Sequence, residues 1–281
     1  MNGILLVDKP SGMTSHDVVD RIRKATKIRR VGHTGTLDPS ATGLLIICIG
    51  SATRLSDHIT GQEKEYTGTF TLGSTTPSYD LETEVDNTFP TDHITEELLH
   101  TTLNQFVGTI DQYPPVFSAL KKEGKRLYEY ARAGKTVDIP KRGVHISAFE
   151  ITGIDLPDVH FRVACSKGTY IRSLAHDFGK ALNNGGHLSA LRRTKIGEFD
   201  VTEVVDLLIP ESNLPPTDAL VFNLSNGRIV IRPSGTEPMV KVYVEVTESV
   251  INDDVRSAER SADHKIEDLL HGVSSLFQVE K

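Results

Sequence analysis

The chain has 281 residues, of which 38% are hydrophobic and 25% are charged, a composition typical of folded globular proteins. Its two cysteines, Cys48 and Cys165, exclude a disulfide framework and a cysteine-rich zinc module. The net charge of −7 by itself disfavours a nucleic-acid partner, because affinity for phosphate backbones depends on Lys and Arg. The longest apolar run, 44–49, is too short to cross a membrane, and the first residues lack a signal-peptide pattern, so we expect a cytoplasmic protein.

The first hundred residues predict short strands mixed with helices. Residues 4–7 are apolar enough for a buried strand, and either Thr14 or Ser15 is expected to cap a helix that follows it. The apolar side chains of that helix share one face and are Val18, Val19 and Ile22. Further elements are predicted as strands at 44–49 and 66–72 and as a helix capped by Thr95 and continuing to Phe106.

The second hundred residues continue this mixture. They predict a short helix at 127–133, strands at 144–154 and 159–165, and a helix over 171–182. The run Asn183-Asn184-Gly185-Gly186 ends that last helix, since Asn and Gly adopt the backbone conformations of a helix stop.

The sequence pattern changes after Phe199. Three prolines within 209–217 predict a linker, followed by two strands around 225–227, a strand at 239–246 and a helix over 252–276. The fold class is therefore α+β, with a small β-β-β-α tail. We predict three segments: a body at 1–208, a linker at 209–218 and the tail at 219–281.

Charge is segregated along the chain. Residues 21–30 hold six basic side chains and no acidic one, and 121–142 hold eight basic against three acidic. Arg192, Arg193 and Lys195 form a third basic cluster, whereas 78–97 carry seven acidic residues without Lys or Arg. The net charge consequently says little about any one face, and the clusters fit either a single positive surface or ordinary solvated helix faces.

The loop at 31–43, VGHTGTLDPSATG, holds a carboxylate at a rigid turn. Gly32, Gly35 and Gly43 indicate tight backbone geometry, and Pro39 restricts Asp38. Asp38 is therefore either a fixed reactive carboxylate or the cap of a turn.

This loop resembles the signature of the TruB family of tRNA pseudouridine-55 synthases. Further motifs of that family follow in the same order along the chain. They are DKPSGMTSHDVV at 8–19, Lys64-Glu65-Tyr66, QYPP at 112–115, KGTYIRSLAHDFG at 167–179 and LRRT at 191–194. The resemblance covers residues 1 to about 205 and implies a pseudouridine-synthase fold with a mixed, mainly antiparallel sheet flanked by helices.

The resemblance implies the isomerisation of one uridine in the T loop of tRNA, at position 55, without metal or cofactor. Asp38 matches the essential aspartate of the family, Arg172 an arginine that pairs with it, and Tyr66 a tyrosine that stacks on the flipped base. A surface arginine and an ordinary strand tyrosine are the alternatives for Arg172 and Tyr66. The other residues implied in substrate binding are His33, Tyr170, Leu191, Asp80, Lys9 and Lys64. We expect the T arm of tRNA as the partner, no membrane association and a monomer.

The tail contains a second motif, RPSGTEP at 232–238, whose closely spaced hydrogen-bond donors are typical of an anion-binding site. Residues 219–281 resemble part of the C-terminal phosphate-binding domain of phosphohexomutases, in which Arg232, Ser234, Gly235 and Thr236 would bind a phosphate. The other loops that a mutase needs are not visible in the chain. The tail is thus either an added phosphate-binding element or the inert remnant of a gene fusion.

Three functions remain open from the sequence. The first is a tRNA pseudouridine synthase that uses Asp38, Tyr66 and Arg172. The second is a tRNA-binding folding factor without catalysis, and the third is a phosphosugar-binding module built on Arg232.

Overall fold

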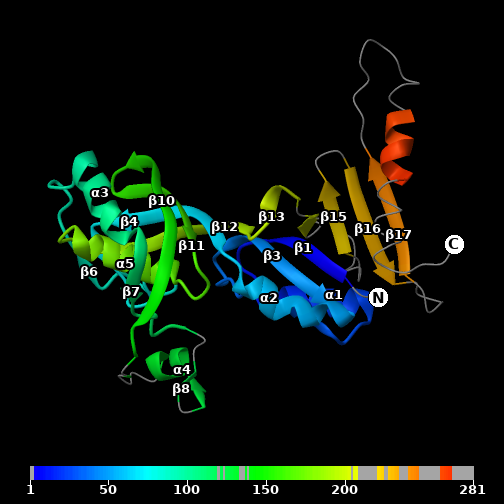
Figure 1. The fold of residues 1–281 in the computed structure, drawn as a ribbon, viewed down its shortest axis with the longest axis horizontal. Coiled ribbons are helices and arrows are strands. Elements are labelled where there is room, and N and C mark those ends of the chain that lie inside the picture. Colours follow the sequence, from blue (N-terminus) through cyan, green and yellow to red (C-terminus); the bar gives the residue numbers. More distant parts are fainter. Residues whose placement is uncertain are drawn as a thin grey trace, which may run out of the picture. The chain divides into compact units, whose positions relative to one another are not determined.

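The structure is a computed structural model, and it forms two compact units (Figure 1). The N-terminal unit comprises Met1–Thr60 and Phe199–Lys281, and the central unit comprises Gly61–Glu198. The residues that the structure describes are 3–118, 121–122, 124–132, 137, 139–203, 205–207, 220–224, 227–233, 240–246 and 260–267.

The N-terminal unit is built around two paired strands and a helix. Strand β1 (Gly3–Lys9) lies antiparallel to β3 (Thr42–Ile49), which also pairs with β2 (Val31–His33). Helix α1 (Ser15–Thr26) buries the predicted apolar stripe of Val18, Val19 and Ile22. Thr14 caps it in a capping box with Asp17, which explains why the helix begins there.

The described strands of the tail extend the sheet of this unit. A short strand β14 (Val205–Leu207) pairs in parallel with β1, and the order then continues antiparallel through β15 (Leu220–Leu224), β16 (Gly227–Pro233) and β17 (Val240–Val246). The strands predicted for the tail are therefore confirmed. Of the predicted last helix the structure describes 260–267, and the predicted linker lies outside the described residues, so the division into three segments stays a prediction.

The central unit is an antiparallel sheet with helices on one face. Its strand order is β12 (Gly186–Ile196), β4 (Lys64–Leu72), β11 (Asp158–Cys165), β10 (Arg142–Asp155) and β7 (Gly108–Gln112). Helices α3 (Glu96–Leu103, capped by Thr95) and α5 (Ile171–Ala181) pack on this sheet. The remaining short elements are η1 (Gly50–Leu55), α2 (Ser56–Gly61), β5 (Ser74–Thr75), β6 (Asn87–Thr88), η2 (Asn104–Phe106), β8 (Lys121–Lys122), β9 (Lys125–Arg126), α4 (Leu127–Arg132), β13 (Phe199–Asp200) and η3 (Val201–Glu203).

Aromatic side chains fill the core between this sheet and its helices. The rings of Phe70 on β4 and Phe161 on β11 stack with centroids 4.1 Å apart. Phe178 of α5 contacts Phe70, Phe149 and Phe106 at centroid distances of 5.8 to 5.9 Å. This burial fixes the position of α5 on the sheet, and α5 carries the predicted site residue Arg172 and begins directly after another, Tyr170. The mixed sheet with helices confirms the α+β class.

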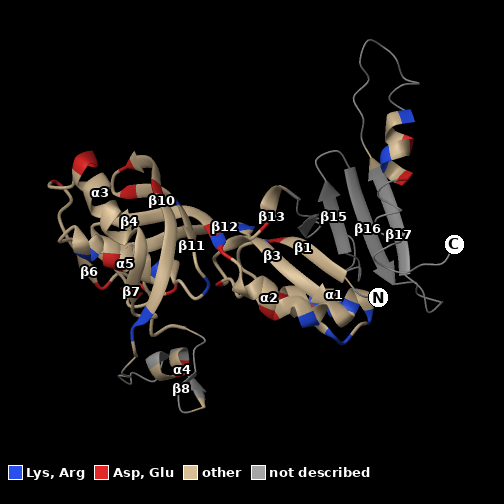
Figure 2. Cartoon of the chain, viewed as in Figure 1, with Lys and Arg blue, Asp and Glu red and all other residues tan. Residues whose placement is uncertain are grey.

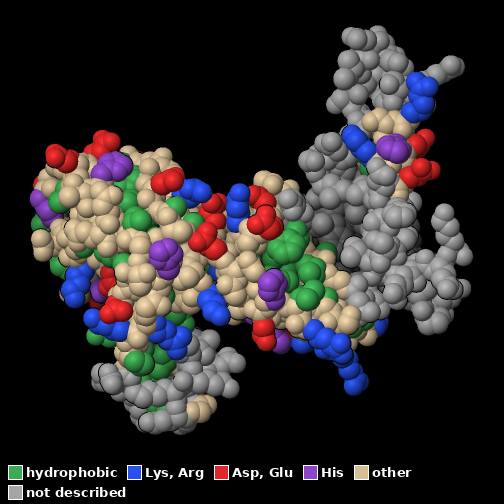
Figure 3. All heavy atoms as spheres, viewed as in Figure 1, with side chains coloured by type: hydrophobic (Ala, Val, Ile, Leu, Met, Phe, Trp, Pro, Cys, Tyr) green, Lys and Arg blue, Asp and Glu red, His purple; other side chains and the backbone are tan. Residues whose placement is uncertain are grey.

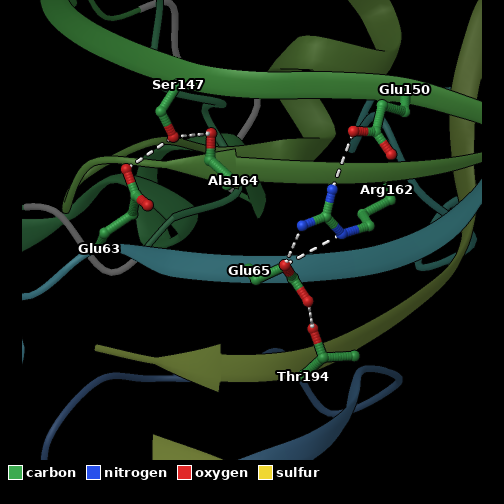
Figure 4. Close-up of polar contacts among 7 residues, drawn as sticks. All are labelled: Glu63, Glu65, Ser147, Glu150, Arg162, Ala164 and Thr194. Atoms are coloured by element: carbon green, nitrogen blue, oxygen red, sulfur yellow. Dashed lines mark hydrogen bonds and ion pairs between the residues drawn. The ribbon is translucent and has the colours of Figure 1, made fainter. Parts of the chain in front are cut away.

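The opposite face of the sheet is polar and is held by cross-strand pairs (Figure 4). Arg162 on β11 donates to Glu65 on β4 at 2.6 Å and to Glu150 on β10 at 3.0 Å. Thr194 on β12 donates to the other oxygen of Glu65 at 2.8 Å. Hydrogen bonds and ion pairs thus connect four neighbouring strands on a solvent-facing surface, which favours one register of the sheet.

Helix α5 also carries a carboxylate whose environment makes stability depend on pH. Burial raises the pKa of Asp177 to about 6, against the opposing effect of Lys180 and Lys141. Because the folded pKa lies above the unfolded value, the protonated form stabilises the fold, and this stabilisation is lost as the pH rises through about 6.

We therefore expect the variant Asp177→Asn to gain stability relative to the wild-type chain as the pH rises. Urea unfolding at about pH 5 and about pH 7.5 measures the difference, which is larger at the higher pH. Asp92→Asn, the same change on an exposed loop, serves as the control. An equal difference at both pH values would contradict the prediction.

Candidate functional site

The predicted loop around Asp38 connects β2 to β3 and is closed by backbone contacts. The amide of Ala41 donates to the Asp38 carbonyl at 3.1 Å, and the amide of Gly12 donates to the Pro39 carbonyl at 2.8 Å. Gly35 and Gly43 have φ angles of 137° and 97°, which L-residues with a side chain rarely adopt. The tight geometry expected from the glycines is confirmed for Gly35 and Gly43, whereas Gly32, within β2, has no positive φ angle and open space beside its Cα.

Two buried polar side chains hold this loop from the neighbouring elements. Lys9, at the end of β1, is fully buried, and its ammonium group donates to the carbonyls of Pro10, Met13 and Pro39 at 2.9, 2.8 and 3.2 Å. The Ser15 hydroxyl contacts both the amide and the carbonyl of Leu37, at 2.9 and 3.2 Å. Asp38 therefore lies between two residues whose backbone is tied to the interior of the unit.

We expect Lys9→Met to destabilise the chain by about 2 to 4 kcal/mol, because the buried carbonyls then lose a donor. Urea unfolding measures the loss, and the activity of the chain should fall with it as the Asp38 loop loosens. Arg54→Met removes an exposed basic side chain of the same unit and should change neither quantity. Equal stability of the two variants would show that the ammonium group does not hold the loop.

His33 lies in β2 opposite Ile47 of β3. Its ring Nδ1 is 3.4 Å from the amide nitrogen of Gly35, at the start of the Asp38 loop. His33, Lys9 and Asp38 thus belong to the N-terminal unit, where the first two flank the loop that carries the third.

The remaining predicted residues belong to the central unit. Tyr66 is 8% exposed near the start of β4, between Val163 on β11 and Arg193 on β12. Lys64, two residues earlier, points to the same side of the strand by alternation and is buried as well. Burial, with a smaller effect of the nearby Arg193, lowers the pKa of Lys64 to about 8.

Arg172 and Asp80 form a buried ion pair. Arg172 lies in the first turn of α5, and its Nη1 is 3.4 Å from Oδ2 of Asp80 and 3.4 Å from the carbonyl of Ser78. Oδ1 of Asp80 accepts from the Glu82 amide at 2.9 Å, and its backbone bridges to Leu188 at the start of β12. The guanidinium is 5% exposed, which excludes the surface arginine considered from the sequence.

Tyr170 and Leu191 lie on either side of Arg172 in the chain. Tyr170 is the N-cap residue of α5, and Leu191 lies on β12 opposite Gly68 of β4. The central unit thus contains Tyr66, Lys64, Asp80, Tyr170, Arg172 and Leu191. In the part of the chain that the structure describes, no group of three His, Cys, Asp or Glu side chains is placed to hold a metal ion.

Sequence reasoning missed several buried polar residues beside these. Arg193, counted with the basic clusters, is 1% exposed and so is not an open phosphate contact. Gln112 and Ser173 are each 1% exposed; Gln112 contacts the backbone of Tyr170, and the Ser173 hydroxyl donates to the Tyr113 carbonyl. The sequence signal for all three was only their position within motifs of the family.

Comparisons with known proteins agree with these motifs. Residues 23–171 match the family described as TruB family pseudouridylate synthase (N terminal domain). A relative from Flavobacterium johnsoniae is 56% identical over 218 residues, covering 75% of this chain and 95% of the relative. The chain belongs to the TruB family of pseudouridylate synthases. It is therefore an RNA pseudouridine synthase, an isomerase.

Other relatives of this TruB-family chain align with a similar share of its length. The Flavobacterium protein and one from Parabacteroides distasonis, 53% identical with 69% of this chain and 86% of the relative covered, are both named tRNA pseudouridine synthase B. Residues 188–262 match a different family, described as phosphoglucomutase/phosphomannomutase, C-terminal domain. The tail thus resembles part of an unrelated enzyme, as its sequence motif indicated.

Solved structures share the fold of the TruB-family part. A chain from a Cbf5-Nop10-Gar1 complex is 33% identical with a TM-score of 0.56, and one from an H/ACA RNP bound to a substrate RNA containing 2'-deoxyuridine is 30% identical with a TM-score of 0.55. Both alignments cover 73% of this chain, which spans about half the length of those solved chains. No described helix is long and apolar enough to span a membrane.

Proposed function

We propose that this enzyme converts the uridine at position 55, in the T loop of tRNA, to pseudouridine. The observation that carries the proposal is the 56% identity to a protein named tRNA pseudouridine synthase B over 95% of that protein's length. The proposal places the enzyme in the cytoplasm with its tRNA, acting as a monomer.

The proposed reaction needs a target base outside the RNA stack, because a stacked uracil cannot rotate relative to its own ribose. The Tyr66 ring would hold the flipped base, and the Asp38 carboxylate would act at the sugar–base bond as the uracil leaves and rejoins through carbon. His33, Tyr170, Leu191, Lys9, Lys64 and Asp80 keep their proposed roles in or around the substrate site.

Electrostatics supports an RNA partner despite the negative net charge. Basic side chains gather at the C-terminal end of α1 and on the loop that follows it (Figure 2, Figure 3). Those that are exposed are Arg21, Lys24, Lys27, Arg29 and Arg30. A surface of this charge suits the phosphate backbone of a folded RNA, which provides binding without sequence readout.

The test uses the full chain and a tRNA transcript, with pseudouridine mapped by carbodiimide adducts that stop primer extension. Modification at position 55, and none in a transcript with cytidine there, is the expected result. A chain that binds the transcript without modifying it would instead be the folding factor, and modification at another position would refute the assignment of the site.

The match at 188–262 supports a second, separable proposal for the tail. Arg232, Ser234, Gly235 and Thr236 would bind a phosphate, as the resemblance to phosphohexomutases implies. Arg232 lies on β16 and pairs in register with Lys241 of β17, whereas the other three lie outside the described residues. Titration of the full chain and of Arg232→Ala with glucose 1-phosphate tests the proposal, and equal heats for the two would refute it.

A further inference from the structure

Strands β7 and β10 pair up to Gln112 and Arg142, which are Cα partners at the end of the hairpin. The segment 113–141 therefore leaves the sheet and returns to it at this point. Gln112, the last residue before the segment, is 1% exposed although its side chain is polar. A buried amide needs hydrogen-bond partners for both its oxygen and its nitrogen.

The Gln112 amide finds both partners on the backbone of a single residue. Its Oε1 accepts from the Tyr170 amide at 2.8 Å, and its Nε2 donates to the Tyr170 carbonyl at 3.0 Å. A second bond follows next to it, in which the Ser173 hydroxyl donates to the Tyr113 carbonyl at 2.7 Å. Three hydrogen bonds thus join the foot of the segment 113–141 to the start of α5.

The start of α5 depends on this contact. Tyr170 is the N-cap residue, yet its side chain makes no capping hydrogen bond, and its carbonyl already accepts the first helical bond from Leu174. The Gln112 side chain bonds both peptide groups that flank Tyr170 and so fixes the backbone on either side of the N-cap residue, whereas a capping side chain would bond an amide further into the first turn. Arg172, paired with Asp80, lies two residues further on in the same turn.

We propose that Gln112 is a positioning residue of the pseudouridine synthase, which sets Tyr170 and Arg172 in their working geometry by holding the first turn of α5. The inference rests on the proposed roles of Tyr170 and Arg172 in the reaction. Gln112 touches neither reacting atom in this scheme. It acts by fixing Tyr170, which is implied in substrate binding, and Arg172, which is implied to pair with Asp38, and small errors in such placement lower the reaction rate.

Gln112→Ala is expected to lower the single-turnover rate of pseudouridine formation by about 10- to 100-fold, while the Kd for tRNA changes by less than about threefold. Gln105→Ala, the same change at an exposed residue of the central unit, keeps the wild-type rate. A wild-type rate for a folded Gln112→Ala variant overturns the proposal, as does a loss carried wholly by Kd.

Gln112→Glu gives a second measurement that does not depend on how well Gln112→Ala folds. An ionised carboxylate still accepts from the Tyr170 amide but cannot donate to the Tyr170 carbonyl, whereas the protonated acid can do both. The rate of this variant, divided by the wild-type rate at each pH, is therefore expected to rise as the pH falls. A ratio that is flat with pH, or that matches Gln105→Glu, contradicts the proposal.

The wild-type chain separates this inference from the proposed function. If it forms no pseudouridine in tRNA, the proposed function fails, and with it the basis of the inference. If it is active and the Gln112 variants match the Gln105 variants, only the positioning role is refuted.

Discussion

Asp38→Asn is expected to abolish pseudouridine formation, with a fall of at least about 10⁴-fold in single-turnover rate, while tRNA binding changes only severalfold. The amide has nearly the shape of the carboxylate but cannot carry the negative charge that the reaction needs. The loop should keep its form, because Ala41 and Lys9 hold it through the carbonyls of residues 38 and 39.

Rapid-quench measurement with excess enzyme, beside a filter-binding titration, separates the two effects. Asp57→Asn, at an exposed residue of the same unit, makes the same chemical change and should leave both quantities unaltered. Residual turnover within about tenfold of wild type would rule out an essential carboxylate at this position.

The local signals in the sequence predicted many elements of this fold. Helix α1 begins after the residue that its capping box requires, and its apolar spacing buries one face. Strands β1, β3, β4, β10 and β11 also lie where apolar runs or alternation placed them. The apolar spacing of these elements is visible within a few residues of chain, which is why a single sequence predicts them even though the strands pair with distant partners.

Strand β12 was missed for a physical reason. Its pairing with β4 shifts register between Leu188 and Ala190 and again between Arg193 and Lys195, so the simple alternation of a strand is interrupted twice. The second shift accompanies a fully buried Arg193, which reads as a surface residue in the sequence. Similarly, the sequence predicts the strands of the tail but not that β14 joins them to β1.

The candidate site was predicted from family motifs rather than from spacing. Asp38, Tyr66 and Arg172 are far apart in the chain, and no local pattern relates them. The contact of Arg172 with Asp80 and the contact of Gln112 with Tyr170 join residues 92 and 58 positions apart, respectively. Such pairings arise from tertiary packing, and only coordinates reveal them.

Removal of either partner of the Arg172–Asp80 pair is expected to cost about 3 kcal/mol of unfolding free energy, since it takes from the other, buried charge the ion-pair partner that lies beside it. Both side chains are less than a tenth exposed, so water cannot replace the lost partner. Arg172→Met and Asp80→Asn should each show this loss in urea unfolding, and Arg172→Met should also lose most of the activity.

The double variant Arg172→Met with Asp80→Asn tests whether the two charges act on each other. Its loss should be smaller than the sum of the single losses by about 1 to 3 kcal/mol, because the second change removes the charge that the first one stranded. Glu150→Gln, which breaks the shorter but exposed contact with Arg162 at 3.0 Å, should cost less than about 1 kcal/mol. If the two single losses simply add, the charge of Asp80 does not stabilise the charge of Arg172. Burial would then fail to explain why this pair, although longer than the Arg162–Glu150 pair, is expected to contribute more to stability.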